Sequence, residues 1–67
     1  SGSVDFDRLA ACVRNVLTRT PQGVPEIADK VSAHYRHEHL ASAVHVVLYR
    51  LADKGLAHKI YASHWTA

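Results

Sequence analysis

The sequence predicts a single α+β domain in which three helices are followed by a C-terminal β-hairpin. Apolar residues recur at helical spacing in three stretches, turn-forming residues separate these stretches, and the chain beyond Gly55 alternates as short strands do. A length of 67 residues fits one domain, expected over 4–67. We set Ser1-Gly2-Ser3 aside because it resembles an expression scar.

The first helix is predicted by an amphipathic pattern that ends near Arg19, with Ser3 or Asp5 as its N-cap. Its apolar stripe consists of Phe6, Leu9, Val13, Val16 and Leu17. The segment Thr20-Pro21-Gln22-Gly23 predicts a turn, because the residue before a proline is pushed out of the helical region and glycine accepts unusual dihedral angles. Val24 then has room for one bridge of strand at most.

The second helix is predicted from Pro25 to Tyr35, since a proline suits the first helical position. Its stripe is Ile27, Ala28, Val31 and Tyr35. After the polar segment 36–39, the third helix is predicted from Leu40 to Lys54. This stretch has the strongest pattern, with a stripe of Val44, Val47, Leu48 and Leu51.

The end of the chain predicts a β-hairpin. Gly55 stands where a left-handed residue closes a helix. Leu56–Ile60 alternates as a half-buried strand, Tyr61-Ala62-Ser63 can turn, and His64-Trp65-Thr66 can return as its partner. Three helices followed by such a hairpin are typical of a winged helix-turn-helix, in which helix three faces the ligand and the hairpin is the wing. A three-helix bundle with a frayed tail is the alternative.

Composition excludes several function classes. A core of this size has roughly 3 to 5 kcal/mol to spare, which makes a large catalytic cavity and an elaborate enzyme unexpected. The chain is 48% hydrophobic and 21% charged, and it lacks the run of about 18 apolar residues that a membrane-spanning helix needs. The single cysteine, Cys12, cannot form an internal disulfide. We therefore expect a reducing intracellular compartment, the nucleus or the cytoplasm.

The excess positive charge lies in the second half of the chain. The formal net charge is +2, and the residues from Ser1 to Tyr35 balance to zero. The half from Arg36 to Ala67 also holds five of the six histidines, so its positive charge grows as the pH falls below about 6.5. A one-sided basic surface is typical of a protein that binds polyanions, although an ordinary solvated face would look the same.

The outward face of helix three carries Ser42, Val46, Tyr49 and Asp53, with His45 and Arg50 on its flanks. Helices that read bases in the major groove of B-DNA use Arg, Lys, Asn or Gln, and none of these stands at the centre of this face. Contact with the shape of the backbone is the better expectation, with Lys54, His58 and Lys59 adding charge. Tyr49 could also simply pack against Trp65.

The run from Val44 to Gly55, followed by a strand and Trp65, resembles the third helix and wing of the Zα winged-helix domains, which bind left-handed Z-DNA and Z-RNA. The resemblance implies that Tyr49 contacts a syn guanine, while Trp65 packs on Tyr49 and helps to hold the zigzag phosphates. His45 and Val46 stand where the family has asparagine and arginine, and Ser63-His64 replaces paired prolines. Bacterial winged-helix repressors and helicase-associated winged helices carry a similar run.

We therefore expect a non-enzymatic module that binds double-stranded nucleic acid, with the ring of Tyr49 and the indole of Trp65 meeting at one solvent-facing surface. Two other functions remain open: a B-DNA-binding transcriptional regulator, for which a homodimer is possible, and a protein-interaction winged helix. The histidines at 34, 37 and 39 could suggest zinc with Cys12 or Glu38, but there is no second cysteine, so we expect no metal and no cofactor. The expected nucleic-acid contacts are Ser42, His45, Tyr49, Arg50, Lys54, Lys59 and Trp65.

Overall fold

The computed structural model describes residues 3–67, so Ser1 and Gly2 of the expected scar lie outside the described residues. Over this range the chain forms three helices and a three-stranded antiparallel sheet, which confirms the predicted α+β class. The elements are α1 (Phe6–Val16), β1 (Gln22–Gly23), α2 (Val24–Val31), α3 (Leu40–Asp53), β2 (His58–Tyr61) and β3 (His64–Thr66).

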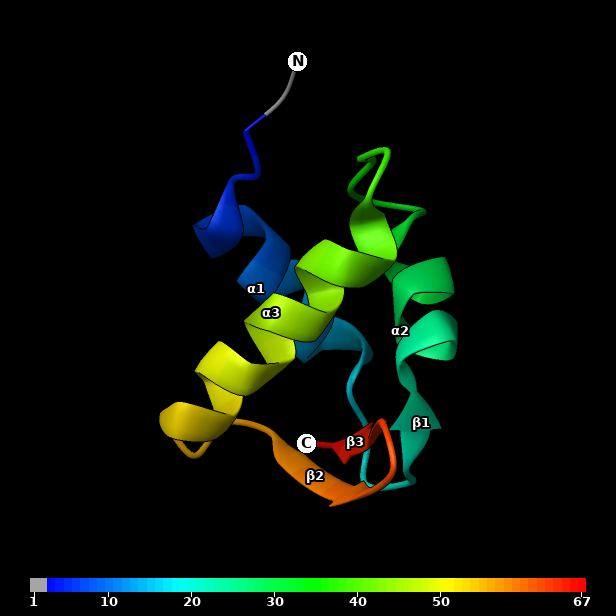
Figure 1. Cartoon of the computed structure of the whole chain (residues 1–67), viewed down its shortest axis with the longest axis vertical. Coiled ribbons are helices and arrows are strands. Elements are labelled where there is room, and N and C mark those ends of the chain that lie inside the picture. The colour runs from blue at the N-terminus through cyan, green and yellow to red at the C-terminus, as the bar shows by residue number, and fades with distance from the viewer. Residues whose placement is uncertain (1–2) are drawn as a thin grey trace.

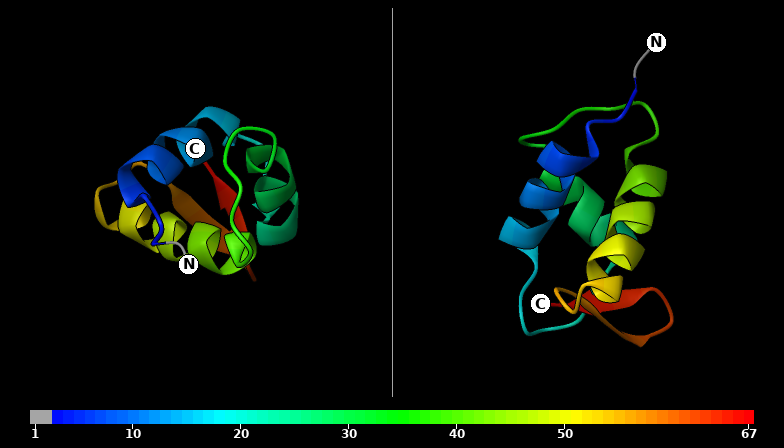
Figure 2. Two further views of the ribbon diagram at one scale, coloured as in Figure 1. Left: turned by 90° about the horizontal axis from the view of Figure 1, so that it is seen from above. Right: turned by 90° about the vertical axis from the view of Figure 1, so that its left-hand side faces the viewer.

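The three helices pack around one core, and the sheet lies at one end of them (Figures 1 and 2). The predicted helical stripes supply this core, because each helix turns its apolar face inward. The largest fully buried side chains are Trp65, Leu9, Ile27, Leu48, Val13, Val31, Val44 and Val47. Within residues 3–67, no helix is both long enough and apolar enough to cross a membrane.

Two helices end earlier than the sequence predicted. Helix α1 stops at Val16 instead of near Arg19, because Leu17 is extended and the hydroxyl of Thr18 bonds to the backbone of Thr20. Helix α2 stops at Val31 instead of Tyr35. There the chain turns so that the hydroxyl of Tyr35 accepts the backbone N–H of Asp5 at 2.8 Å. Of the two predicted N-caps, Ser3 and Asp5, Asp5 is the N-cap of α1, and its carboxylate accepts the backbone N–H of Arg8.

The end of α3 follows the prediction. Gly55 has φ 74°, and the N–H of Leu56 reaches back to the carbonyl of Leu51 at 2.8 Å. This bond keeps Leu56 in the helix cap, so strand β2 begins at His58, two residues later than expected.

The sheet has the order β1-β3-β2, which makes the last strand the central one. The expected single bridge at Val24 is instead a two-residue strand: Gln22 pairs with Trp65 and Gly23 with His64. On the other side, Lys59 pairs with Trp65 and Tyr61 with His64. Because successive side chains of a strand alternate between faces, Trp65 lies on the face toward the helices and His64 on the outer face.

Candidate functional site

A half-exposed tyrosine ring on α3 is held by two residues of the β2–β3 hairpin. The ring of Tyr49 stands edge-on to the indole of Trp65, with centroids 5.0 Å apart and planes at 86°. The ammonium of Lys59 donates to the Tyr49 hydroxyl at 3.2 Å and lies 5.7 Å from the ring centroid. Tyr49 still exposes 46% of its surface. The helix and the hairpin therefore meet at one surface, and Tyr49 is its centre.

Two further predicted residues lie on the same face of α3. The ring of His45, one turn before Tyr49, has its centroid 5.2 Å from that of Tyr49. Ser42 is exposed a further turn along the face. Beside them, Val46 exposes 45% of its surface. We call the group Ser42, His45, Tyr49 and Lys59 the Tyr49 surface.

The expectation for Trp65 is confirmed in one respect and wrong in another. The indole does pack on Tyr49, but it exposes 0% of its surface, so it is not solvent-facing. The reason is its position on the central strand β3, on the face that the helices cover, where a large aromatic ring buries much apolar area. Its Nε1–H has no acceptor among residues 3–67. Trp65 thus supports the Tyr49 ring from beneath and presents no surface to a ligand.

The structure separates Arg50 and Lys54 from the Tyr49 surface. The guanidinium of Arg50 lies 4.2 Å from the ring centroid of Phe6 on α1, a cation–π contact. Arg50 and Lys54 both line a small hollow between α1 and α3, together with Asp7. Of the seven predicted contacts, these two face the α1 side of the helix. The sequence did not indicate this, because Phe6, the partner of Arg50, lies far from it in the chain.

The hairpin holds residues that sequence reasoning did not select. Ile60 and Tyr61 are exposed on β2, and the ring of Tyr61 stacks on His64 with centroids 4.4 Å apart. The sequence prediction placed Tyr61 in the turn. The sequence did carry one signal for this pair: aromatic residues on both sides of a short turn become cross-strand partners when the turn closes a hairpin.

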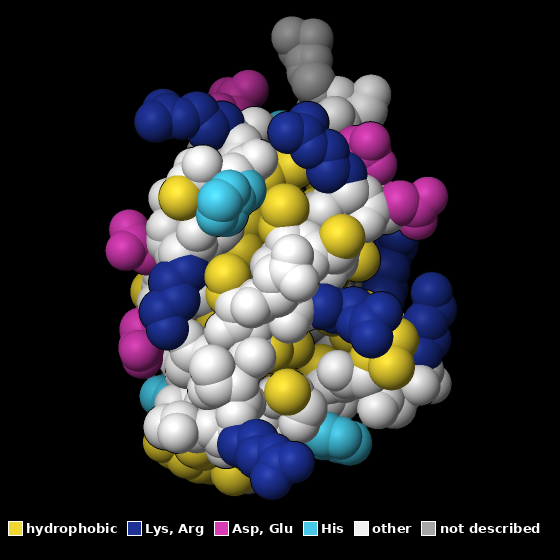
Figure 3. Space-filling view, turned by 180° about the vertical axis from the view of Figure 1, so that it is seen from behind, with side chains coloured by type: hydrophobic (Ala, Val, Ile, Leu, Met, Phe, Trp, Pro, Cys, Tyr) yellow, Lys and Arg dark blue, Asp and Glu magenta, His cyan; other side chains and the backbone are white. Residues whose placement is uncertain are grey.

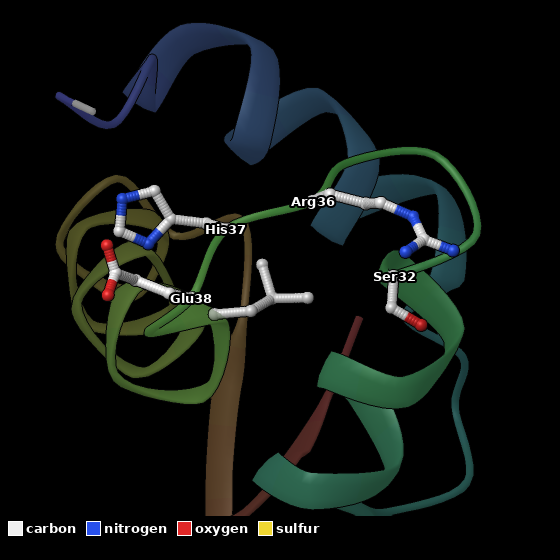
Figure 4. A pocket seen from close by; sticks show the side chains of 5 residues that line it. Ser32, Arg36, His37 and Glu38 are labelled. Carbon is white, nitrogen blue, oxygen red and sulfur yellow. The ribbon is translucent and has the colours of Figure 1, made fainter. Parts of the chain in front are cut away.

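A second concave region lies at the opposite end of the molecule from the sheet. It is an open hollow of about 460 Å³ where the chain passes from α2 to α3. Figure 4 shows Arg36 pointing toward Ser32 while His37 and Glu38 lie on the other side. Because the hollow holds a carboxylate as well as a guanidinium, it is no uniform anion site.

Charge on the face behind α3 is mixed. On the face opposite to α3, Lys and Arg side chains are scattered among acidic and hydrophobic ones (Figure 3). Among the residues that the structure describes, no three His, Cys, Asp or Glu side chains gather where they could hold a metal ion. The Tyr49 surface combines an exposed ring with several hydrogen-bond donors from both the helix and the hairpin, beside the exposed Val46.

This surface can offer four donors to an anionic, irregular ligand: the hydroxyl of Ser42, an imidazole, a phenol and an ammonium, beside the apolar Val46. In comparisons with known proteins, no family model, no curated protein and no solved structure matches this chain.

Proposed function

We propose that this domain is a winged-helix module that binds double-stranded nucleic acid and recognises the left-handed backbone of Z-DNA or Z-RNA. In this proposal α3 is the recognition helix and the β2–β3 hairpin is the wing. The observation that carries the proposal is the half-exposed ring of Tyr49, fixed edge-on by the buried Trp65 and bonded to Lys59.

The arrangement of elements supports the winged-helix part of the proposal. Three helices precede a hairpin, and the hairpin meets the outward face of α3 through Lys59 and Trp65. A ligand on α3 would therefore also touch the wing. The Tyr49 and Trp65 contact is the one that the resemblance to Zα domains implies.

The chemistry of the surface supports shape recognition over base reading. Bidentate contacts to base edges in B-DNA need Arg, Asn or Gln, and the exposed centre of α3 has Val46 and Tyr49 instead. A flat ring and a valine suit an exposed base edge or sugar. His45 and Lys59 can donate to phosphates on either side of the ring.

Two positions reduce the affinity for nucleic acid that we expect of this domain relative to Zα domains. Val46 cannot donate to a phosphate, and Trp65 is covered by its neighbours, so His45, Tyr49 and Lys59 supply most of the backbone contacts. With Lys59 as the only permanent cation of the Tyr49 surface, binding should depend less steeply on salt than in proteins that contact many phosphates.

The mechanism that we propose is selection of a conformation. A protein that binds the left-handed duplex more tightly than the right-handed one shifts their equilibrium by that difference in affinity, and by no more. The rigid support of Tyr49 matters here, because a ring that is already ordered loses little entropy on binding.

A circular dichroism titration of an alternating CG duplex tests the proposal. We expect the wild-type domain to convert the right-handed spectrum to the left-handed one, and Tyr49→Ala to abolish this conversion. Tyr61→Ala is the matched control, since it removes another exposed tyrosine, 56% exposed against 46% for Tyr49, from the outer face of the hairpin. A right-handed spectrum at saturating wild-type protein would contradict the proposal.

A protein-interaction module is the second candidate, and the exposed Val46, Leu56 and Ile60 favour it. It predicts no salt-dependent binding to any nucleic acid, whereas phosphate contacts weaken as salt rises. A salt series on the same duplex separates the two candidates.

A further inference from the structure

The outer face of the sheet carries a stacked pair of aromatic rings. Tyr61 and His64 are cross-strand partners, and their rings lie 4.4 Å apart at an interplanar angle of 16°. His64 alternates with Trp65 along β3, so this pair faces away from the helices. It is therefore separate from the Tyr49 surface, which lies on the other side of the same hairpin.

The stacked pair is ordered by its surroundings. The pairing partner of His64 on β1 is Gly23, whose backbone passes close to the imidazole: a Cβ there would be in ordinary van der Waals contact with the His64 Nε2, at 3.7 Å. The Nδ1 of His64 lies 2.6 Å from the carbonyl oxygen of Ala62. Ser63 holds φ 52°, a left-handed conformation that costs a non-glycine residue on the order of 1 kcal/mol. The short turn thus keeps both rings in place.

The chemistry of the pair suits a nucleobase. Tyr61 exposes 56% of its surface, the largest fraction among the large hydrophobic side chains of the described chain. An exposed aromatic face stacks on any base, since every base has a π-face. The same strand carries the exposed His58, whose imidazole can donate to a phosphate. The neighbouring carboxylate, Glu26, is engaged by the backbone N–H of Gly23 at 3.3 Å.

We propose that Tyr61 and His64 form a stacking platform for one unpaired nucleobase at the end of the bound duplex. This inference rests on the proposed function, because the duplex on α3 brings the unpaired nucleotide close. The paired part of the duplex cannot reach the platform, since it would occupy the opposite face of the hairpin. A flexible single strand can, because β2 is an edge strand and, within residues 3–67, no further strand pairs with its outer edge.

Binding of duplexes with and without a single-stranded end tests the platform. We expect a short thymine overhang to raise the affinity for an alternating CG duplex by about tenfold, a size typical of stacking on one aromatic ring. Tyr61→Ala should abolish the gain from the overhang and leave the affinity for the blunt duplex unchanged. Tyr61→Phe should retain the gain.

The matched control is Ile60→Ala, which removes an exposed side chain of the same strand outside the stacked pair. It should retain the full gain from the overhang. Thermal unfolding of each variant checks that the hairpin is intact. An overhang that adds nothing, or a gain that survives Tyr61→Ala, would overturn the platform.

A separate titration distinguishes this inference from the proposed function. Adding oligothymidylate to the wild-type domain should move the ring-proton NMR signals of Tyr61 upfield, and leave those of Tyr49 in place. Failure to bind the blunt duplex, with the Tyr61 signals still shifted by oligothymidylate, would refute the proposed function but leave the stacking of a base on Tyr61 supported. Unmoved Tyr61 signals at saturating oligothymidylate would refute the platform, whatever the blunt duplex does.

Discussion

Trp65 could support Tyr49 or contact a ligand, and substitutions at this position can tell the two roles apart. We predict that Trp65→Ala is largely unfolded, because truncating a buried tryptophan costs about 3–5 kcal/mol. A domain of this size has about that much stability in total. The informative variant is therefore Trp65→Phe, which keeps a six-membered ring against Tyr49.

Two opposing effects set the stability of Trp65→Phe. The atoms lost from the indole leave a void that costs on the order of 2 kcal/mol. The indole N–H, which has no acceptor in the described chain, is removed as well, and an unsatisfied buried donor costs about 1–3 kcal/mol. The two nearly cancel, so we expect a change in the free energy of unfolding within about 1 kcal/mol. Chemical denaturation followed by far-ultraviolet circular dichroism measures it.

The binding of Trp65→Phe decides between the roles. Trp65 exposes no surface, so we expect the Trp65→Phe variant to bind an alternating CG duplex with an affinity within about threefold of wild type. This difference is below about 1 kcal/mol and is measured by fluorescence anisotropy. Tyr49→Ala should lose at least tenfold in the same assay. A folded Trp65→Phe that binds as poorly as Tyr49→Ala would contradict this account, because it would show that a six-membered ring behind Tyr49 is not enough for binding.

Three further predictions concern charge and local conformation. Lys59→Met should reduce the slope of log affinity against log salt by about one, and an unchanged slope would remove Lys59 from the phosphates. Gly55→Ala should lower the free energy of unfolding by about 1 kcal/mol, because φ is 74° while the space around it is open; equal stability would contradict this. Asp5→Ala should cost about 1 kcal/mol as a lost N-cap, and Asp5→Ser, which restores the cap, should recover most of it by thermal denaturation.

The parts of the fold that depend on local signals could be predicted from the sequence. The stripe of Val44, Val47 and Leu48 identified α3 and its buried face, and Gly55 identified where it closes. The ends of α1 and α2 could not be predicted. They depend on a hydroxyl contact at Thr18 and on the distant bond between Tyr35 and Asp5.

The sequence predicted which residues lie near Tyr49 better than it predicted their burial and their contacts with other elements. The contact between Tyr49 and Trp65 was expected both as simple packing between helix three and the hairpin and from the resemblance. The burial of Trp65 depends on β1, a strand of two residues that makes β3 central. The position of Arg50 depends on Phe6, a partner from another helix. Such contacts between distant segments leave no periodic signal in the sequence.

The central claim is a difference in affinity between two forms of one duplex. Competition between an alternating CG duplex chemically held in the left-handed form and a right-handed duplex of equal length and charge measures this difference directly. The account predicts that the left-handed duplex binds at least tenfold more tightly to the wild-type domain, and that Tyr49→Ala loses this preference. Equal affinity of the wild-type domain for both duplexes would contradict it.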